Sequence, residues 1–165
     1  MAVLRGTNAI LADAVADALA DASLSLHLEP VRAYLPTLEL TDSETLHCTV
    51  IPRHRSGDIS GQGSGTAEQH TVDVVIQQRL KPAETGEFRG DIANDEVDPL
   101  LYLAEEVADF FLRWRPTVVP ALDAVCTATG SNAQAKDLNS LYEPSHLKTL
   151  HQITIVVTLR FEVQR

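Results

Sequence analysis

The clearest pattern of apolar positions lies at the end of the chain. Over residues 153–163 every second side chain is apolar, and most of the side chains between them are polar. This period of two predicts a strand that buries one face and leaves the other mostly in water. At about 3.3 Å per residue the strand spans roughly 36 Å, about twice the usual length. The architecture is therefore expected to depend on how this strand pairs.

The same alternation predicts three earlier strands. The first covers residues 31–40, where Pro30 and Pro36 restrict it to a sheet edge or a bulge. The second covers residues 44–51 and the third residues 70–80. We expect these last two strands to pair as a hairpin.

The segment between these two strands predicts a long, flexible hairpin loop at residues 52–68, because it is rich in glycine and serine. Loops of this length in a compact domain are usually functional or disordered. Within the hairpin, Cys48 and Val50 are expected to face the core. His47 and His70 are expected to lie across from each other on the outward face.

Two segments predict helices. Residues 7–24 carry apolar side chains on one side at helical spacing, and Thr7 or Asn8 is suited to cap the helix. Asp98 and Pro99 predict the start of a second helix, with the aspartate as cap and the proline at the first helical position. The second helix is amphipathic and is expected to lie across the sheet.

After the second helix, which is expected to end near residue 115, the pattern is weaker. It predicts a short strand at 124–129, a polar loop at 130–146 and one turn at 147–151. The order of elements is α-β-β-β-α-β-β. We therefore predict one α+β domain over residues 1–165, with two main helices packed on a mixed or antiparallel sheet of four or five strands.

The charge balance limits the classes of partner. The chain has 23 acidic and 13 basic residues and a net charge of -10, and such a surface repels nucleic acid and anionic membranes. No stretch approaches the roughly 20 apolar residues of a membrane-spanning helix. Cys48 and Cys126 lie in alternating apolar segments and are interpreted as buried thiols of a reducing cytoplasm. They would form a disulfide only if their positions face each other.

The chain carries no recognisable catalytic or metal-binding motif. The glycines at residues 61–65 are not followed by the lysine of a phosphate-binding loop, and Ser64 between them does not lie on a strand-to-helix turn. The six histidines lack zinc spacing. Residues 91–98 lack the alternating ligands and the glycine of a calcium loop. We therefore expect no enzymatic activity, no cofactor and no metal.

Two charged clusters are candidate interaction sites. Asp13, Asp17 and Asp21 form a ridge at i, i+4 spacing on the first helix. This ridge is interpreted either as a solvated face or as a surface that meets a basic partner or repels a polyanion.

The second cluster lies at the start of the predicted loop. Arg53, His54 and Arg55, followed by Ser56 and Asp58, interrupt an otherwise acidic chain. They are interpreted either as the solubilising base of the loop or as a docking patch for an acidic neighbour, including another copy of the chain.

The order and size of these elements resemble the tail terminator and tail completion proteins of long-tailed bacteriophages. The helix that contains Asn-Ala-Ile-Leu-Ala-Asp-Ala-Val at residues 8–15 leads into a strand and a hairpin with a long tip at 52–68. An amphipathic helix at 97–115 crosses the sheet, and a Tyr-Glu-Pro turn at 142–144 leads into the closing strand 153–163. The resemblance covers most of the chain.

The resemblance implies a structural virion protein without catalytic activity. Such proteins form rings, usually hexameric, at the head-proximal end of the tail, where they end polymerisation of the tail tube and join the tail to the head. The implied partners are other copies of the chain, the tail tube protein and the head-completion or connector proteins. The implied location is the virion, after synthesis in the bacterial cytoplasm, with no membrane association.

DNA passes through such a ring without specific binding, and an acidic lumen keeps it from adhering. The aspartate ridge or the acidic segment 84–98 is expected to line that lumen or an interface. The loop 52–68 is expected to become ordered on docking. The closing strand 153–163, if it lies at a sheet edge, would need cover from a neighbouring copy.

Two alternatives remain open. Head-completion or connector proteins of the neck share much of the pattern, and the tail tube protein is a further alternative within the same class. A small cytoplasmic ligand-binding domain or enzyme is the second alternative, and it would show convergent polar residues in a pocket.

Overall fold

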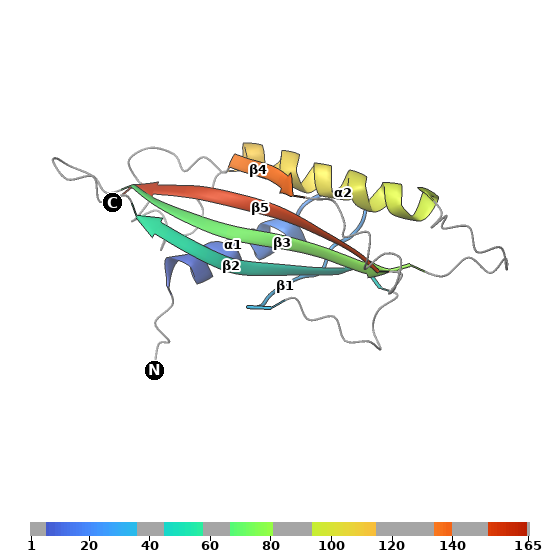
Figure 1. Cartoon of the computed structure of the whole chain (residues 1–165), viewed down its shortest axis with the longest axis horizontal. Helices are drawn as coiled ribbons and strands as arrows, with labels where there is room; N and C mark the ends of the chain where they lie inside the picture. The colour runs from blue at the N-terminus through green and yellow to red at the C-terminus, as the bar shows by residue number, and fades with distance from the viewer. Residues whose placement is uncertain are drawn as a thin grey trace.

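The computed structural model describes residues 6–35, 45–57, 67–80, 94–114, 134–139 and 152–164. Within these residues the elements follow the predicted order α-β-β-β-α-β-β (Figure 1). The strands form one sheet in the order β1-β2-β3-β5-β4. The elements are α1 (Thr7–Ala20), β1 (Pro30–Arg32), β2 (His47–Gly57), β3 (Ala67–Arg79), α2 (Asn94–Arg113), β4 (Gln134–Asn139) and β5 (Gln152–Gln164).

The sheet is mixed. β1 is parallel to β2, whereas β2 with β3, β3 with β5, and β5 with β4 are antiparallel pairs. This arrangement confirms the predicted α+β class and the predicted hairpin of the second and third strands.

The closing strand β5 lies inside the sheet, not at its edge. It pairs with β3 along its whole length, with Val157 opposite Val74, and with β4 on its other side. The predicted alternation is confirmed, because the side chains from Ile153 to Phe161 are buried at every second position. On its second side β4 pairs with Val156, Val157, Leu159 and Arg160, so the expectation of a sticky edge is wrong over this part of β5.

Strands β2 and β3 extend into the predicted loop. β2 continues to Gly57 and β3 begins at Ala67, so the prediction of a loop over 52–68 is wrong at both ends. The register shifts between Pro52 and His54. Proline has no N–H to donate, and a bulge accommodates it without ending the strand. The middle of the predicted loop lies outside the described residues.

Strand β1 is shorter than predicted. It comprises Pro30–Arg32 at one edge of the sheet, which confirms the edge position that the prolines indicated. Residue Ala33 still donates its backbone N–H to the carbonyl of Val50 at 3.1 Å, but Tyr34 and Leu35 then leave the sheet and are exposed. The rest of the predicted strand lies outside the described residues.

Helix α1 ends at Ala20, earlier than predicted, because the aspartate and serine residues that follow favour turn conformations. The predicted caps are wrong. Gly6 is the N-cap, and no side chain caps the helix. The side chain of Asn8 instead contacts His70.

Helix α2 begins at Asn94, so the prediction of a start at Asp98 and Pro99 is wrong. Pro99 lies in the second turn, where it has no N–H to donate to the carbonyl of Asp95 and its ring crowds that carbonyl. The acidic residues at this end are favourable near the positive end of the helix dipole. The other end, Arg113, agrees with the prediction to within two residues.

Strand β4 lies within the segment that the sequence predicts as a polar loop, residues 130–146, so that prediction is wrong there. Its sequence, QAKDLN, does not alternate, and its register with β5 shifts between Ala135 and Leu138. Polar and charged residues are common in edge strands, whose backbone supplies the pairing. The predicted strand 124–129 and turn 147–151 lie outside the described residues.

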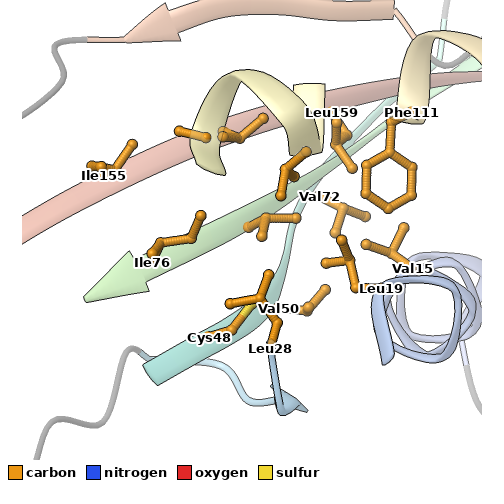
Figure 2. Packing of buried hydrophobic residues seen from close by; sticks show 14 of the residues in the cluster. Val15, Leu19, Leu28, Cys48, Val50, Val72, Ile76, Phe111, Ile155 and Leu159 are labelled. Carbon is orange, nitrogen blue, oxygen red and sulfur yellow. The ribbon is translucent and has the colours of Figure 1, made fainter. Parts of the chain in front are cut away.

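Both helices cover the same face of the sheet. Helix α1 packs over β1, β2 and β3, and α2 packs over β5 and β4. Figure 2 shows side chains from both helices meeting the strands in one apolar cluster. The cluster includes Val15, Leu19, Leu28, Cys48, Val50, Val72, Val74, Ile76, Phe111, Ile155, Val157, Leu159 and Phe161.

Candidate interaction surfaces

The predicted aspartate ridge is present on α1, but its three carboxylates have different surroundings. Asp17 and Asp21 are exposed, and Asp21 lies just past the helix as its C-cap. Asp13 is half-buried and forms an ion pair with Arg32 of β1. The ridge therefore offers two exposed carboxylates to a partner, while the third joins α1 to the edge strand.

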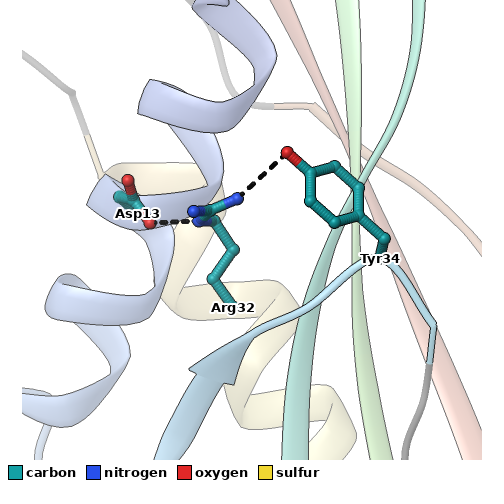
Figure 3. Close-up of polar contacts among 3 residues, drawn as sticks. All are labelled: Asp13, Arg32 and Tyr34. Atoms are coloured by element: carbon teal, nitrogen blue, oxygen red, sulfur yellow. Dashed lines mark hydrogen bonds and ion pairs between the residues drawn. The ribbon is translucent and has the colours of Figure 1, made fainter. Parts of the chain in front are cut away.

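Arg32 also holds an exposed tyrosine (Figure 3). Its Nη1 donates to the hydroxyl of Tyr34 at 3.3 Å, and its guanidinium carbon lies 5.6 Å from the centroid of the Tyr34 ring. The hydrogen bond with Tyr34, together with the neighbouring Asp13 carboxylate, raises the pKa of Arg32 above its ordinary value. The sequence did not predict this cluster, because Asp13 on the helix and Arg32 on the edge strand are 19 residues apart in the chain.

The basic cluster at the end of β2 is partly engaged within the fold. Arg53 is 55% exposed, yet its Nε donates to Oδ2 of Asp73 at 2.7 Å. The other oxygen of Asp73 accepts from the hydroxyl of Thr158 at 2.8 Å. This network joins β2, β3 and β5 on the sheet face away from the helices.

The remaining members of that cluster divide in two. His54 is exposed on β2 beside Arg53. Arg55 and Ser56 belong to β2 by their backbone, but their side chains, and all of Asp58, lie outside the described residues. If these residues dock an acidic neighbour, they do so from the end of strand β2 and not from the start of a loop.

The sheet face away from the helices is less exposed than the alternation predicts. Gln77 on β3 donates from its Nε2 to the hydroxyl of Thr154 at 3.3 Å. Its Oε1 is buried and has no hydrogen-bond partner within the described part of the chain. The buried side chains of this face are Thr49, Ile51, Asp73, Val75 and Gln77.

A buried polar cluster joins the start of β3 to the start of α1. His70 is fully buried; its Nδ1 lies 2.6 Å from Oδ1 of Asn8, and its Nε2 lies 3.3 Å from Oε2 of Glu68, which is also buried. With the amide oxygen as acceptor, Nδ1 carries a hydrogen. The contact with Glu68 then needs a second proton between Nε2 and the carboxyl group.

The expectation that His47 and His70 face each other outward is wrong. His47 lies opposite Gln77, and His70 lies opposite Arg55, near the other end of the hairpin. The alternation itself contained the correct signal, because His70 shares its parity with the core residues of β3.

The described residues contain no group of three histidine, cysteine, aspartate or glutamate side chains arranged to hold a metal. Cys48 is a buried free thiol, and its burial raises its pKa to about 12. It is therefore a protonated core side chain at neutral pH, not a nucleophile. Cys126 lies outside the described residues. In the described ranges, no helix has the length and apolar character needed to cross a membrane.

Comparisons with known proteins gave no match that indicates a function. No protein-family model matches the chain, and no curated protein is significantly similar to it.

Proposed function

We propose that this chain is a structural subunit of the ring at the head-proximal end of a long-tailed phage tail. There it ends tube polymerisation and joins the tail to the head. The observation that carries the proposal is the acidic helix layer, which lies on one side of a sheet built around three long antiparallel strands. Paired over most of their length, the long strands form a stiff wall segment.

The exposed charges of the helix layer are strongly unbalanced. Helix α2 exposes one basic side chain, Arg113, within the described residues. The exposed acidic side chains of the two helices and the α1 C-cap are Asp17, Asp21, Glu96, Asp98, Glu105 and Asp109. A wall with this charge repels the phosphates of DNA, which suits a channel through which DNA passes without binding.

Within this proposal, Asp17 and Asp21 line the channel. Asp13 is not available for that role, because Arg32 neutralises it. The proposed partners are further copies of the chain in a hexameric ring, the tail tube protein and the head-completion or connector proteins. The site of action is the virion.

Electron microscopy of the purified protein, and of tails assembled in its presence, tests the proposal. We expect a ring with a central hole that caps the head-proximal end of the tail. Its position in the virion separates the terminator from the neck or tube alternatives. Failure to find the chain in virions would contradict all three.

The channel assignment has its own test. Asp17→Lys with Asp21→Lys should lower phage titre while tails still join heads, because lysines would bind passing phosphates. Gln69→Lys adds a charge on an exposed side chain of β3 and serves as the control. If both variants give the wild-type titre, these aspartates do not line the channel.

A further inference from the structure

The bulge in β2 places two successive basic side chains on the same face of the sheet. His54 lies opposite Thr71 of β3, and Arg53 reaches Asp73 of the same strand, so both side chains lie on the face away from the helices. In a regular strand one of two successive side chains points to the other face, whereas a bulge sets two residues against one. The register shift therefore gives this face both basic residues.

A third basic side chain reaches this face from β5. Arg160 lies opposite Thr71, on the side of Thr71 away from β2. His54, Thr71 and Arg160 thus form one row across three strands, which we call the basic row. Neighbouring strands are about 4.8 Å apart, so the backbones at the two ends of the row are roughly 10 Å apart.

The two ends of the basic row are open to a partner. The side chains of His54 and Arg160 are exposed, and neither forms a hydrogen bond or an ion pair within the described part of the chain. Arg53 differs from them, because Asp73 already neutralises it. Arg160 therefore carries the permanent charge of the row, and His54 adds a second charge when it is protonated.

The two faces of the subunit differ in charge. Among the described side chains of β2, β3 and β5, the one carboxylate on the face of the basic row is Asp73, and it is buried against Arg53. On the helix side, the exposed acidic side chains are Asp17, Asp21, Glu96, Asp98, Glu105 and Asp109. The basic row is therefore the surface that attracts carboxylates, whereas the helix side repels them.

The spacing of the row fits an acidic protein segment better than other anions. One small anion is held by donors that converge on it, whereas two bases roughly 10 Å apart suit carboxylates spread along a chain. Nucleic acid is a poor occupant, because its binding depends on several phosphate contacts and the net charge of -10 repels it.

We infer that the basic row binds an acidic segment of a different protein. Arg160 pairs with a carboxylate at one end of the row, and protonated His54 pairs with another at the other end. The hydroxyl of Thr71, half-buried between them, donates a hydrogen bond to the segment. This contact goes beyond the proposed function and does not require a ring.

The test measures binding of a rhodamine-labelled peptide of alternating glutamate and serine to the full chain by fluorescence anisotropy. His54→Glu with Arg160→Glu reverses the charge of the row, and His54→Gln with Arg160→Gln removes it more gently. His27→Glu with Arg113→Glu makes the same change at two other exposed positions and is the matched control. Thermal unfolding checks that each variant is folded.

We expect the wild type and the control to bind the peptide with similar affinity, and added salt to weaken both. Charge reversal of the row should weaken binding by about tenfold, and the glutamine variant by less. In the wild type, the backbone amide NMR signals of Thr71 and Arg160 should shift when the peptide is added.

Four results would overturn the inference. The first is a wild type that does not bind the peptide, and the second is an equal loss in the control, which would indicate attraction to any positive charge. The third is tighter binding of a duplex DNA oligonucleotide through the same row. The fourth is self-association that only the row variants lose, which would assign the row to a second copy. None of these results bears on whether the chain is present in virions, so the proposed function is tested separately.

Discussion

The Nδ1 atom of His70 lies 2.6 Å from the amide oxygen of Asn8, a residue 62 positions earlier in the chain. This contact brings the first turn of α1 onto the start of β3. Because Glu68 meets the other ring nitrogen, a buried imidazole joins a helix, a strand and a carboxyl group at one end of the subunit.

Replacing this imidazole with a phenyl ring should be costly. His70→Phe leaves the buried side chain of Glu68 and the half-buried side chain of Asn8 without the ring's two nitrogens, and we expect a loss of about 2–4 kcal/mol in the free energy of unfolding. Urea denaturation measures it. Gln69→Ala, on the exposed neighbour, should change stability by less than about 0.5 kcal/mol. Equal effects of the two substitutions would mean that the cluster contributes no specific stability.

In the network around Asp73, removing the different side chains should lower the free energy of unfolding by different amounts. Asp73→Ala removes a buried acceptor from both Arg53 and Thr158 and should cost about 1–3 kcal/mol. Arg53→Ala should cost at most about 1 kcal/mol, because this side chain is exposed and water screens the ion pair. A double-mutant cycle of the two positions measures their coupling. A coupling larger than the effect of Asp73→Ala alone would contradict this account.

Because the Cys48 thiol is buried, we expect the free energy of unfolding to fall at high pH. Burial raises the pKa of its thiol from 9.0 to about 12, so the folded state holds this proton more tightly than the unfolded state does. Its contribution is complete below about pH 9 and is lost as the pH rises toward about 12. Across this pH range, the free energy of unfolding should fall more steeply with rising pH for the wild type than for Cys48→Val. Identical pH slopes would show that burial does not suppress ionisation of the thiol.

The same thiol predicts slow labelling. In a Cys126→Ser background, a thiol reagent at pH 8 should modify Cys48 only on the timescale of unfolding, and at once in urea, because the thiolate is the reacting form. Rapid modification of the native protein would contradict the buried position.

Much of the fold could be predicted because local pattern and tertiary burial agree. The parity of Ile153 and Ile155 on β5, and of Val72 and Val74 on β3, matches the core face. The predictions fail where hydrogen bonding of the backbone, and not burial of side chains, determines whether a strand forms. β4 is polar and is held by hydrogen bonds to β5, and β2 passes a proline through a bulge; neither feature leaves an apolar signal.

The candidate surfaces were harder to predict. The exposure of Asp17 follows from helix periodicity, but the pairing of Asp13 with Arg32 depends on α1 crossing β1, which no local pattern encodes. Likewise, Arg53 looks like a free loop cation in the sequence. Its bond to Asp73 requires the register of β2 and β3 across the bulge.

Aromatic packing at the end of α2 gives the last prediction. The Phe111 ring is fully buried and lies edge-on to Phe110 at 5.1 Å and to Trp114 at 5.3 Å, and Trp114 reaches Phe161 of β5 at 6.1 Å. Phe111→Ala should therefore lower the free energy of unfolding by about 3–5 kcal/mol, through lost burial and the cavity left behind.

The neighbouring Leu112 supplies the matched control. It follows Phe111 directly on α2 but is 49% exposed, so Leu112→Ala should change stability by less than about 0.5 kcal/mol. Chemical denaturation of both variants, with Trp114 fluorescence as the probe, compares the two positions. A loss at Leu112 as large as that at Phe111 would mean that this side of α2 is covered within the subunit.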